Sequence, residues 1–246
     1  MDRLIWTAMT GMSAAMDRQR VIASNMANAQ TIGFRADVLA ARALSLKGPQ
    51  VEARAMTQAG VLGARMTAGA MIATGRPLDI AMQGEALLAV QAPDGSEAYT
   101  RRGDLAVSPT GLLVNGEGFA VLGEAGPISL PPGGAVSLAE DGGVLLRDPA
   151  NPEAAPTLVG RIKLASPAGS EIAKGLDGLF RVVGGGILPA DAEARVAPAT
   201  LEQSNVKATE VLVEMIAAQR SYDLRTKLIA TARELDQGGA SLMRLS

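Results

Sequence analysis

The 246-residue chain contains no cysteine and no histidine. Without cysteine it can form no disulfide, and it offers no thiolate nucleophile or cysteine-ligated metal site. Without histidine it lacks the commonest general base, and a Ser-His-Asp triad is excluded. Carboxylates alone can still catalyse glycan cleavage, so an enzyme of that class stays open as an alternative. We nevertheless expect no catalytic residue, no metal and no cofactor.

Aromatic residues make up only 2% of the chain, and neither charge sign dominates, since the net charge is −2. Nucleic-acid binding needs a basic surface that displaces counterions, so we expect no such partner. No stretch of 18 apolar residues occurs, so we expect no membrane insertion. The first residues lack the basic start and unbroken apolar core of a Sec signal peptide, so any export should use another route.

Near the amino terminus, apolar residues recur every three or four positions, which predicts one amphipathic helix over about residues 2–29. Its apolar stripe includes Ile5, Met9, Met12 and Met16. A glycine just past a helix is a common stop signal, so Gly33 should help to end it. The methionines fit either an adaptable docking face or an ordinary core, and both interpretations require a partner surface.

The middle of the chain changes to a period of two from Pro77, where Leu78, Ile80 and Met82 face one side. Short apolar runs separated by turn signals continue to about residue 200, which predicts an all-β domain over residues 75–200. The stretch before it, residues 35–74, we interpret as an extended or partly helical connector without a core of its own.

Several charged residues of the middle region invite a functional interpretation. Asp79, Asp104, Asp141 and Asp148 could supply metal ligands or an acid pair, but they match no calcium-loop spacing. We therefore interpret them as structural. The pair Arg101-Arg102 is most simply the solvated end of a strand.

The last segment again shows helical spacing, with Ser204 as a candidate N-cap and Gly238-Gly239 as the expected end. Its heptad row includes Asn205, Leu212, Met215, Gln219, Tyr222 and Ile229. Only part of this row is apolar. Because isolated helices are marginal in water, we expect the two terminal helices to pair with each other and then with other molecules.

These observations predict an α+β fold in which the two terminal helices pair as a coiled-coil-like stalk and an all-β domain lies between them. The expected organisation is an N-terminal helix in residues 1–34, a connector in 35–74, a β-rich domain in 75–200 and a C-terminal helix in 201–246.

Three blocks of sequence resemble the flagellar axial proteins, the family of rod and hook subunits. The first is the segment Asn25–Arg35, the second combines Thr74–Gly84 with Tyr99–Gly103, and the third combines Leu201–Val206 with Met215–Tyr222. The opening residues are most similar to the proximal rod subunits, and next to the distal rod subunits. One departure follows Gly84, where the family usually carries two aromatic residues and this chain has Glu85-Ala86-Leu87-Leu88.

The resemblance implies a structural subunit of the rod, the drive shaft that crosses the periplasm and transmits torque. It implies other rod subunits, proximal and distal, as partners in a helical hetero-oligomer, and export through the flagellar type III apparatus. Outside the family, a secreted β-domain binding module stays open, although it would leave the terminal stripes unexplained.

The motif from Asn25 to Phe34 fits either a contact between subunits or an ordinary helix end, and the resemblance favours the contact. The candidate assembly interface consists of Ile5, Met9, Met12, Met16, Asn25, Asn28, Thr31, Gly33, Phe34, Asn205, Leu212, Met215, Gln219, Tyr222 and Ile229.

Overall fold

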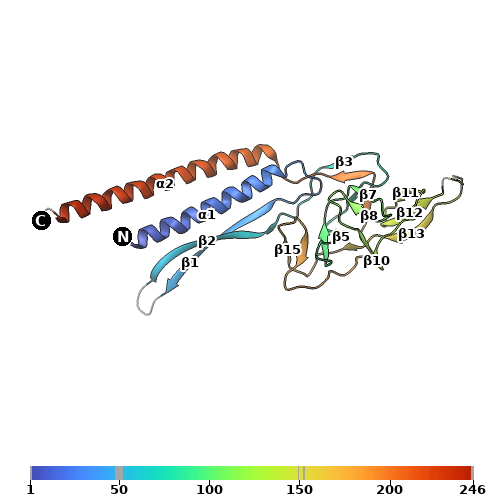
Figure 1. Ribbon diagram of the computed structural model, residues 1–246, viewed down its shortest axis with the longest axis horizontal. Helices are drawn as coiled ribbons and strands as arrows, with labels where there is room; N and C mark the ends of the chain where they lie inside the picture. Colours follow the sequence, from blue (N-terminus) through green and yellow to red (C-terminus); the bar gives the residue numbers. More distant parts are fainter. Residues whose placement is uncertain (1, 48–51, 149, 152, 245–246) are drawn as a thin grey trace. The chain divides into compact units, whose positions relative to one another are not determined.

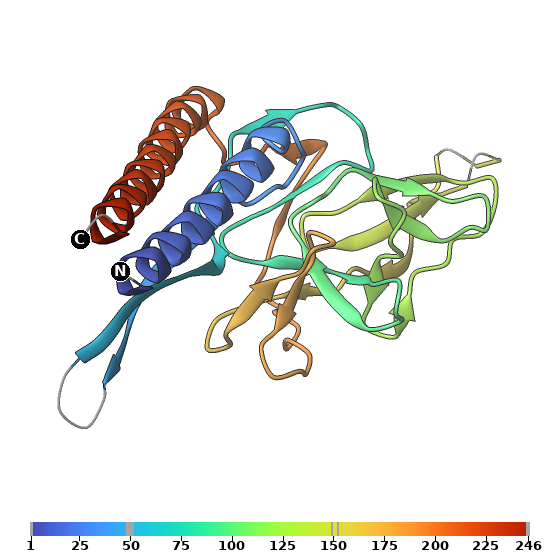
Figure 2. The same ribbon diagram turned by 60° about the vertical axis from the view of Figure 1, so that its left-hand side comes forward.

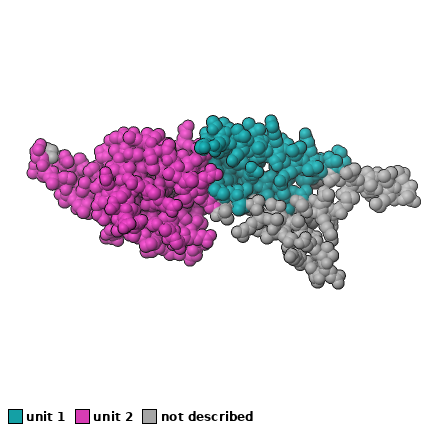
Figure 3. Space-filling view, turned by 180° about the vertical axis from the view of Figure 1, so that it is seen from behind, with its two compact units in different colours: residues 1–27, 37–62, 207–246 teal, residues 28–36, 63–206 magenta. Residues whose placement is uncertain are grey.

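The computed structural model describes residues 2–47, 52–148, 150–151 and 153–244. Along the chain, a long helix comes first, β-strands follow, and a second long helix comes last (Figure 1). This confirms the predicted α+β class. The chain divides into two compact units (Figure 3). Unit 1 contains Met1–Ala27, Asp37–Leu62 and Lys207–Ser246, and unit 2 contains Asn28–Ala36 and Gly63–Val206.

Unit 1 contains the two helices, α1 (Asp2–Ala27) and α2 (Ala208–Arg244). They lie side by side and run in opposite directions, so the chain termini mark the same end of the pair (Figures 1 and 2). Ile22 of α1 is buried, and so are Val211 and Ala218 of α2. Burial of these small and medium apolar side chains stabilises the pair.

Unit 1 also contains a β-hairpin, β1 (Asp37–Lys47) and β2 (Glu52–Ala64), with β1 against α1 (Figure 2). Asn25 of α1 anchors the first strand: its Nδ2 donates to the Asp37 carbonyl at 3.1 Å, and its Oδ1 accepts from the Asp37 amide at 2.8 Å. The sequence led us to expect an extended or partly helical connector without a core of its own here. The structure has a β-hairpin, whose first strand lies against α1.

Unit 2 is built from several small antiparallel sheets. The largest has the strand order β14-β5-β6-β16-β15, with bounds Leu164–Ala165, Leu87–Gln91, Glu97–Thr100, Phe180–Val182 and Ile172–Lys174. A second has the order β11-β12-β13, with bounds Ala135–Leu138, Gly143–Arg147 and Thr157–Arg161. The short strands and the turns between them match the predicted all-β pattern.

Four two-stranded pairs complete unit 2: β3–β18, β4–β17, β7–β8 and β9–β10. Their bounds, in chain order, are Met71–Ala73, Ile80–Met82, Leu105–Val107, Leu113–Asn115, Leu122–Gly123, Gly126–Pro127, Val196–Pro198 and Thr200–Glu202. In the β3–β18 and β4–β17 pairs, strands from the start of the β region pair with strands from its end. These pairs bring its two ends together.

The core of unit 2 is almost entirely aliphatic, as the low aromatic content requires. Fully buried members include Ile80, Met82, Leu88, Val90, Leu105, Leu113, Val121, Val144, Leu179 and Val196. The turns behave as the sequence predicts: Gly95 and Gly111 both have φ of 82°, a conformation that strongly favours glycine.

The C-terminal helix differs from its prediction at both ends. Residues 200–202 form β18, and α2 begins only at Ala208. Ser204 is not the N-cap, since its hydroxyl accepts from the Val206 amide in a local turn at 3.2 Å. The helix also continues through Gly238-Gly239, because glycine makes a helix less favourable without forbidding it.

Candidate functional site

The two ends of unit 2 meet in a small region that we call the junction, made of residues 31–36, Arg101 and residues 202–205. Its backbone is hydrogen bonded directly: the Gly33 amide donates to the Glu202 carbonyl at 2.7 Å, and the Asn205 amide donates to the Phe34 carbonyl at 3.3 Å. Segments about 170 residues apart in sequence are thereby held together.

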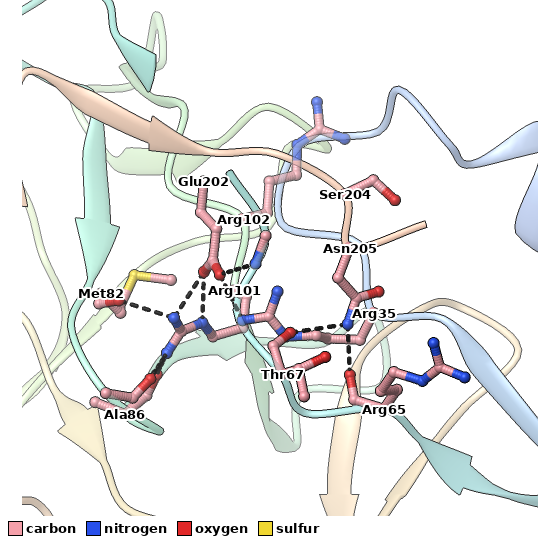
Figure 4. Close-up of polar contacts among 12 residues, drawn as sticks. Arg35, Arg65, Thr67, Met82, Ala86, Arg101, Arg102, Glu202, Ser204 and Asn205 are labelled. Atoms are coloured by element: carbon pink, nitrogen blue, oxygen red, sulfur yellow. Dashed lines mark hydrogen bonds and ion pairs between the residues drawn. The ribbon is translucent and has the colours of Figure 1, made fainter. Parts of the chain in front are cut away.

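The carboxylate of Glu202 is the centre of the junction (Figure 4). Its Oε1 accepts from Arg35 Nη2 at 2.7 Å and from the Gly69 amide at 2.8 Å. Its Oε2 accepts from Arg101 Nε at 2.8 Å. The three charged side chains are at most 1% exposed, so this cluster is buried and charge-assisted.

Arg101 ties the same cluster to the β4–β5 turn. Its guanidinium also donates to the carbonyls of Met82, Gly84 and Ala86 at 2.8, 2.9 and 2.6 Å. Burial lowers the pKa of Arg101, and the Glu202 carboxylate opposes that shift. The interpretation of Arg101 as part of a solvated strand end was wrong, because carboxylate and carbonyl partners allow it to be buried.

The junction carries two guanidinium groups and one carboxylate. Arg35 Nε and Nη1 have no hydrogen-bond partner among the described residues. Burying a cluster of this kind costs free energy, because the charges lose their hydration. The attraction between the charges offsets this cost only while every charge keeps its partner. The chemistry of the junction is that of a structural lock on the two ends of unit 2.

Asn205 closes the junction with three hydrogen bonds. Its Oδ1 accepts from the Ala36 amide at 2.8 Å, and its Nδ2 donates to the carbonyls of Arg65 and Thr67 at 2.7 and 2.9 Å. The sequence placed this residue on the C-terminal helix. The structure places it before α2, where its amide side chain joins its own segment to two others, at Ala36 and at residues 65–67.

We expect Asn205→Ala to lower the free energy of unfolding of unit 2 by about 1–3 kcal/mol, because the Ala36 amide and two carbonyls lose their partner. Chemical denaturation of the full chain, followed by circular dichroism, measures this. Gln83→Ala, at an exposed side chain of the same unit, serves as the control. Equal midpoints for the two variants would contradict the role of Asn205.

The predicted N-terminal motif makes contacts within its own chain. Thr31 Oγ1 donates to Asn28 Oδ1 at 3.1 Å in the turn after α1. Gly33 has φ of 68°, and a Cβ there would lie 2.4 Å from the Arg101 backbone, so glycine is required. The Lys174 Nζ lies 3.6 Å from the centroid of the Phe34 ring. These contacts favour a structural role for the motif.

The predicted helical residues divide into half-buried and exposed positions. Met12, Tyr222 and Ile229 are half-buried, whereas Met9, Met16, Leu212, Met215 and Gln219 are exposed. The Ile5 side chain lies outside the described residues. Val211 and Ala218, which only widened the predicted row, are the buried residues of α2.

Sequence reasoning also missed a second apolar surface on α2, which we call the outer face. It consists of Val213, Ile216, Leu224 and Leu228, all exposed. Their spacings of three, eight and four residues keep them on one side of a 3.6-residue helix, away from Val211 and Ala218. The heptad row of the sequence describes one side of the helix and does not include this face.

The sequence analysis likewise did not predict that the three charged residues of the junction are buried together, although all three lie within the sequence blocks that carry the family resemblance. Arg35, Arg101 and Glu202 each lie in a different one of the three sequence blocks described above. The structure explains why these distant blocks belong together, since one buried ion cluster joins them.

No described helix is sufficiently long and apolar to cross a bilayer. Within the part of the chain that the structure describes, no group of three or more acidic, histidine or cysteine side chains could hold a metal ion.

Three family models match the chain. Residues 5–35 match the model "Flagella basal body rod protein", and residues 81–146 match "Flagellar hook protein FlgE/F/G D1 domain". Residues 197–242 match "Flagellar basal body rod FlgEFG protein C-terminal". Each model covers one of the regions that contribute a charge to the junction.

Curated relatives match along nearly the whole length. The flagellar basal-body rod protein FlgF of Escherichia coli (strain K12) is 43% identical, over 94% of each chain. The FlgF of Salmonella typhimurium is 40% identical over 100% of each chain. The flagellar basal-body rod protein FlgG of Buchnera aphidicola subsp. Baizongia pistaciae is 30% identical, over 95% of this chain and 96% of its own.

Proposed function

The chain belongs to the flagellar basal-body rod protein family, and we propose that it builds the rod by polymerising through its terminal helices. It is a structural subunit of the rod and resembles the rod protein FlgF along nearly its whole length. The rod is part of the flagellar basal body, so the chain works at that location.

The observation that carries this proposal is the two-sided apolar character of α2. One side, with Val211 and Ala218, is buried in unit 1. The other side, the outer face, is exposed, and its Leu228 is 69% accessible. A helix that is apolar on opposite sides is normally buried on both, and each fully buried aliphatic side chain contributes roughly 1.5–3 kcal/mol. Packing against neighbouring subunits would cover the outer face.

We propose that α1 and α2 pair in a coiled-coil-like manner and that this pair forms the stalk through which subunits stack. The exposed Met9 and Met16 of α1, with Leu212 and Met215 of α2, would lie against neighbours in the polymer. Methionine suits such a surface because its unbranched side chain adapts to different partners. In the same proposal, the motif from Asn25 to Phe34 also contacts a neighbouring subunit.

The partners in this proposal are other rod subunits, proximal and distal, joined in a helical hetero-oligomer. The chain would reach the rod through the flagellar type III export apparatus, span the periplasm as part of the drive shaft and transmit torque. We propose that no side chain is catalytic, since the membership of a structural family removes the reason to invoke a glycan-cleaving enzyme or a secreted binding module.

Complementation tests the proposal. A strain that lacks its own proximal rod gene and expresses this chain should regain swimming, and isolated basal bodies should contain the chain. If the expressed chain is folded and produced at normal levels but restores no swimming and is absent from basal bodies, the assignment to the rod is refuted.

A further inference from the structure

Two residues of unit 1 are unexpected for their positions. Gly11 lies in the interior of α1, where glycine is the least favourable helix former apart from proline. Arg225 lies 14 and 7 residues after Val211 and Ala218, so it shares the face of α2 that packs on α1. Although the Arg225 side chain is exposed, a charged residue in line with Val211 and Ala218, like a glycine within a helix, requires a reason.

A direct contact joins these two residues. Arg225 Nη1 donates a hydrogen bond to the backbone carbonyl of Gly11. A Cβ on residue 11 would lie 2.8 Å from the same Nη1, so with any larger residue the flexible end of the Arg225 side chain would have to move. Glycine at position 11 therefore leaves room for this contact.

We infer that Gly11 and Arg225 are positioning residues that fix the axial register of α1 against α2. Near this point α1 carries the small residues Ala8, Ala14 and Ala15 together with the flexible Met9 and Met12. Apolar contact is non-directional, so such a surface distinguishes one register poorly from the next. A charge-assisted hydrogen bond to one particular carbonyl is directional, so a change of register would break it.

The register matters because α2 carries apolar residues on two sides. A slip of one helical turn, about 5.4 Å, would displace the outer face of α2 along α1 and misalign it with exposed Met9 and Met16. This consequence rests on the proposed assembly through the helices. The register itself does not, and it can be measured on the free chain.

The experiment uses the absence of cysteine. Ala23→Cys on α1 and Lys227→Cys on α2, both at exposed side chains, accept spin labels, and pulsed electron spin resonance reports their separation in the full chain. We expect one narrow distance distribution in the parent. In Gly11→Ala and in Arg225→Ala we expect a shift of up to about 5 Å or several populations. Arg225→Lys should retain part of the parent distribution.

Arg220→Ala, at an exposed arginine of the same helix, is the matched control and should leave the distribution unchanged. Circular dichroism of each variant should show unchanged helicity. Parent-like distances in both Gly11→Ala and Arg225→Ala would overturn the inference. Loss of helicity in Arg225→Ala would also overturn it, because Arg225 would then be a general stabiliser. If these variants showed altered spin-label distances but their cells swam normally, the role of the two residues in the register would stand. Assembly through the helices would then be refuted.

Discussion

Replacing Glu202 by glutamine should lower the free energy of unfolding of unit 2 by about 3–5 kcal/mol. The variant leaves Arg35 and Arg101 buried without a carboxylate, although both are at most 1% exposed. Neither guanidinium can neutralise itself by losing a proton near neutral pH. Because whole domains are stable by only about 5–15 kcal/mol, this one substitution removes a large part of the stability.

Urea denaturation of the full chain, with separate probes for helix and sheet, measures the effect. Glu171→Gln removes a charge from an exposed side chain of the same unit and should leave the midpoint almost unchanged. Indistinguishable midpoints for Glu202→Gln and Glu171→Gln would show that the buried cluster contributes nothing to stability. A selective loss of the sheet signal, with the helix signal retained, would show that the two units unfold separately.

The sequence predicted those features that depend on local periodicity. The 3.6-residue spacing located α1 to within two residues of its observed end at Ala27. The period of two and the turn glycines located the β-rich middle, because strands and turns are short-range patterns. The class of fold followed from these signals alone.

The junction could not be predicted in the same way. Arg35 and Glu202 are 167 residues apart, and no local pattern states which charges will be buried together. Charged residues are almost always exposed, so Arg101 was assigned to solvent. Only the tertiary structure supplies the Met82 and Ala86 carbonyls that make its burial tolerable.

The hairpin of β1 and β2 was missed for a related reason. Its residues are rich in alanine and leucine, which favour helix rather than strand. Strand formation depends strongly on surroundings, and here β1 is held against α1 by the two Asn25–Asp37 hydrogen bonds. The start of α2 was misplaced because β18 forms only by pairing with the distant β3.

Introducing a charge on the outer face of α2 should abolish rod incorporation without unfolding the free chain. Ile216→Asp is the sharpest test, since Ile216 is 52% exposed in the free chain and its replacement disturbs little there. In a polymer that buries the outer face, the carboxylate would lose its hydration without gaining a partner. We therefore expect a non-swimming cell and a purified variant with parent-like helicity and unfolding midpoint.

Two further variants isolate the cause. Glu214→Gln changes an exposed charged side chain two positions away and should leave swimming intact. Val211→Asp places a charge at a side chain that is only 8% exposed, so it should separate α2 from α1 and reduce helicity as well as motility. Normal swimming by Ile216→Asp would mean that the outer face stays exposed in the rod, and subunit contacts would then have to be sought elsewhere on the chain. If Ile216→Asp lost helicity as Val211→Asp should, the outer face would belong to the fold of unit 1 and not to its contacts with neighbours.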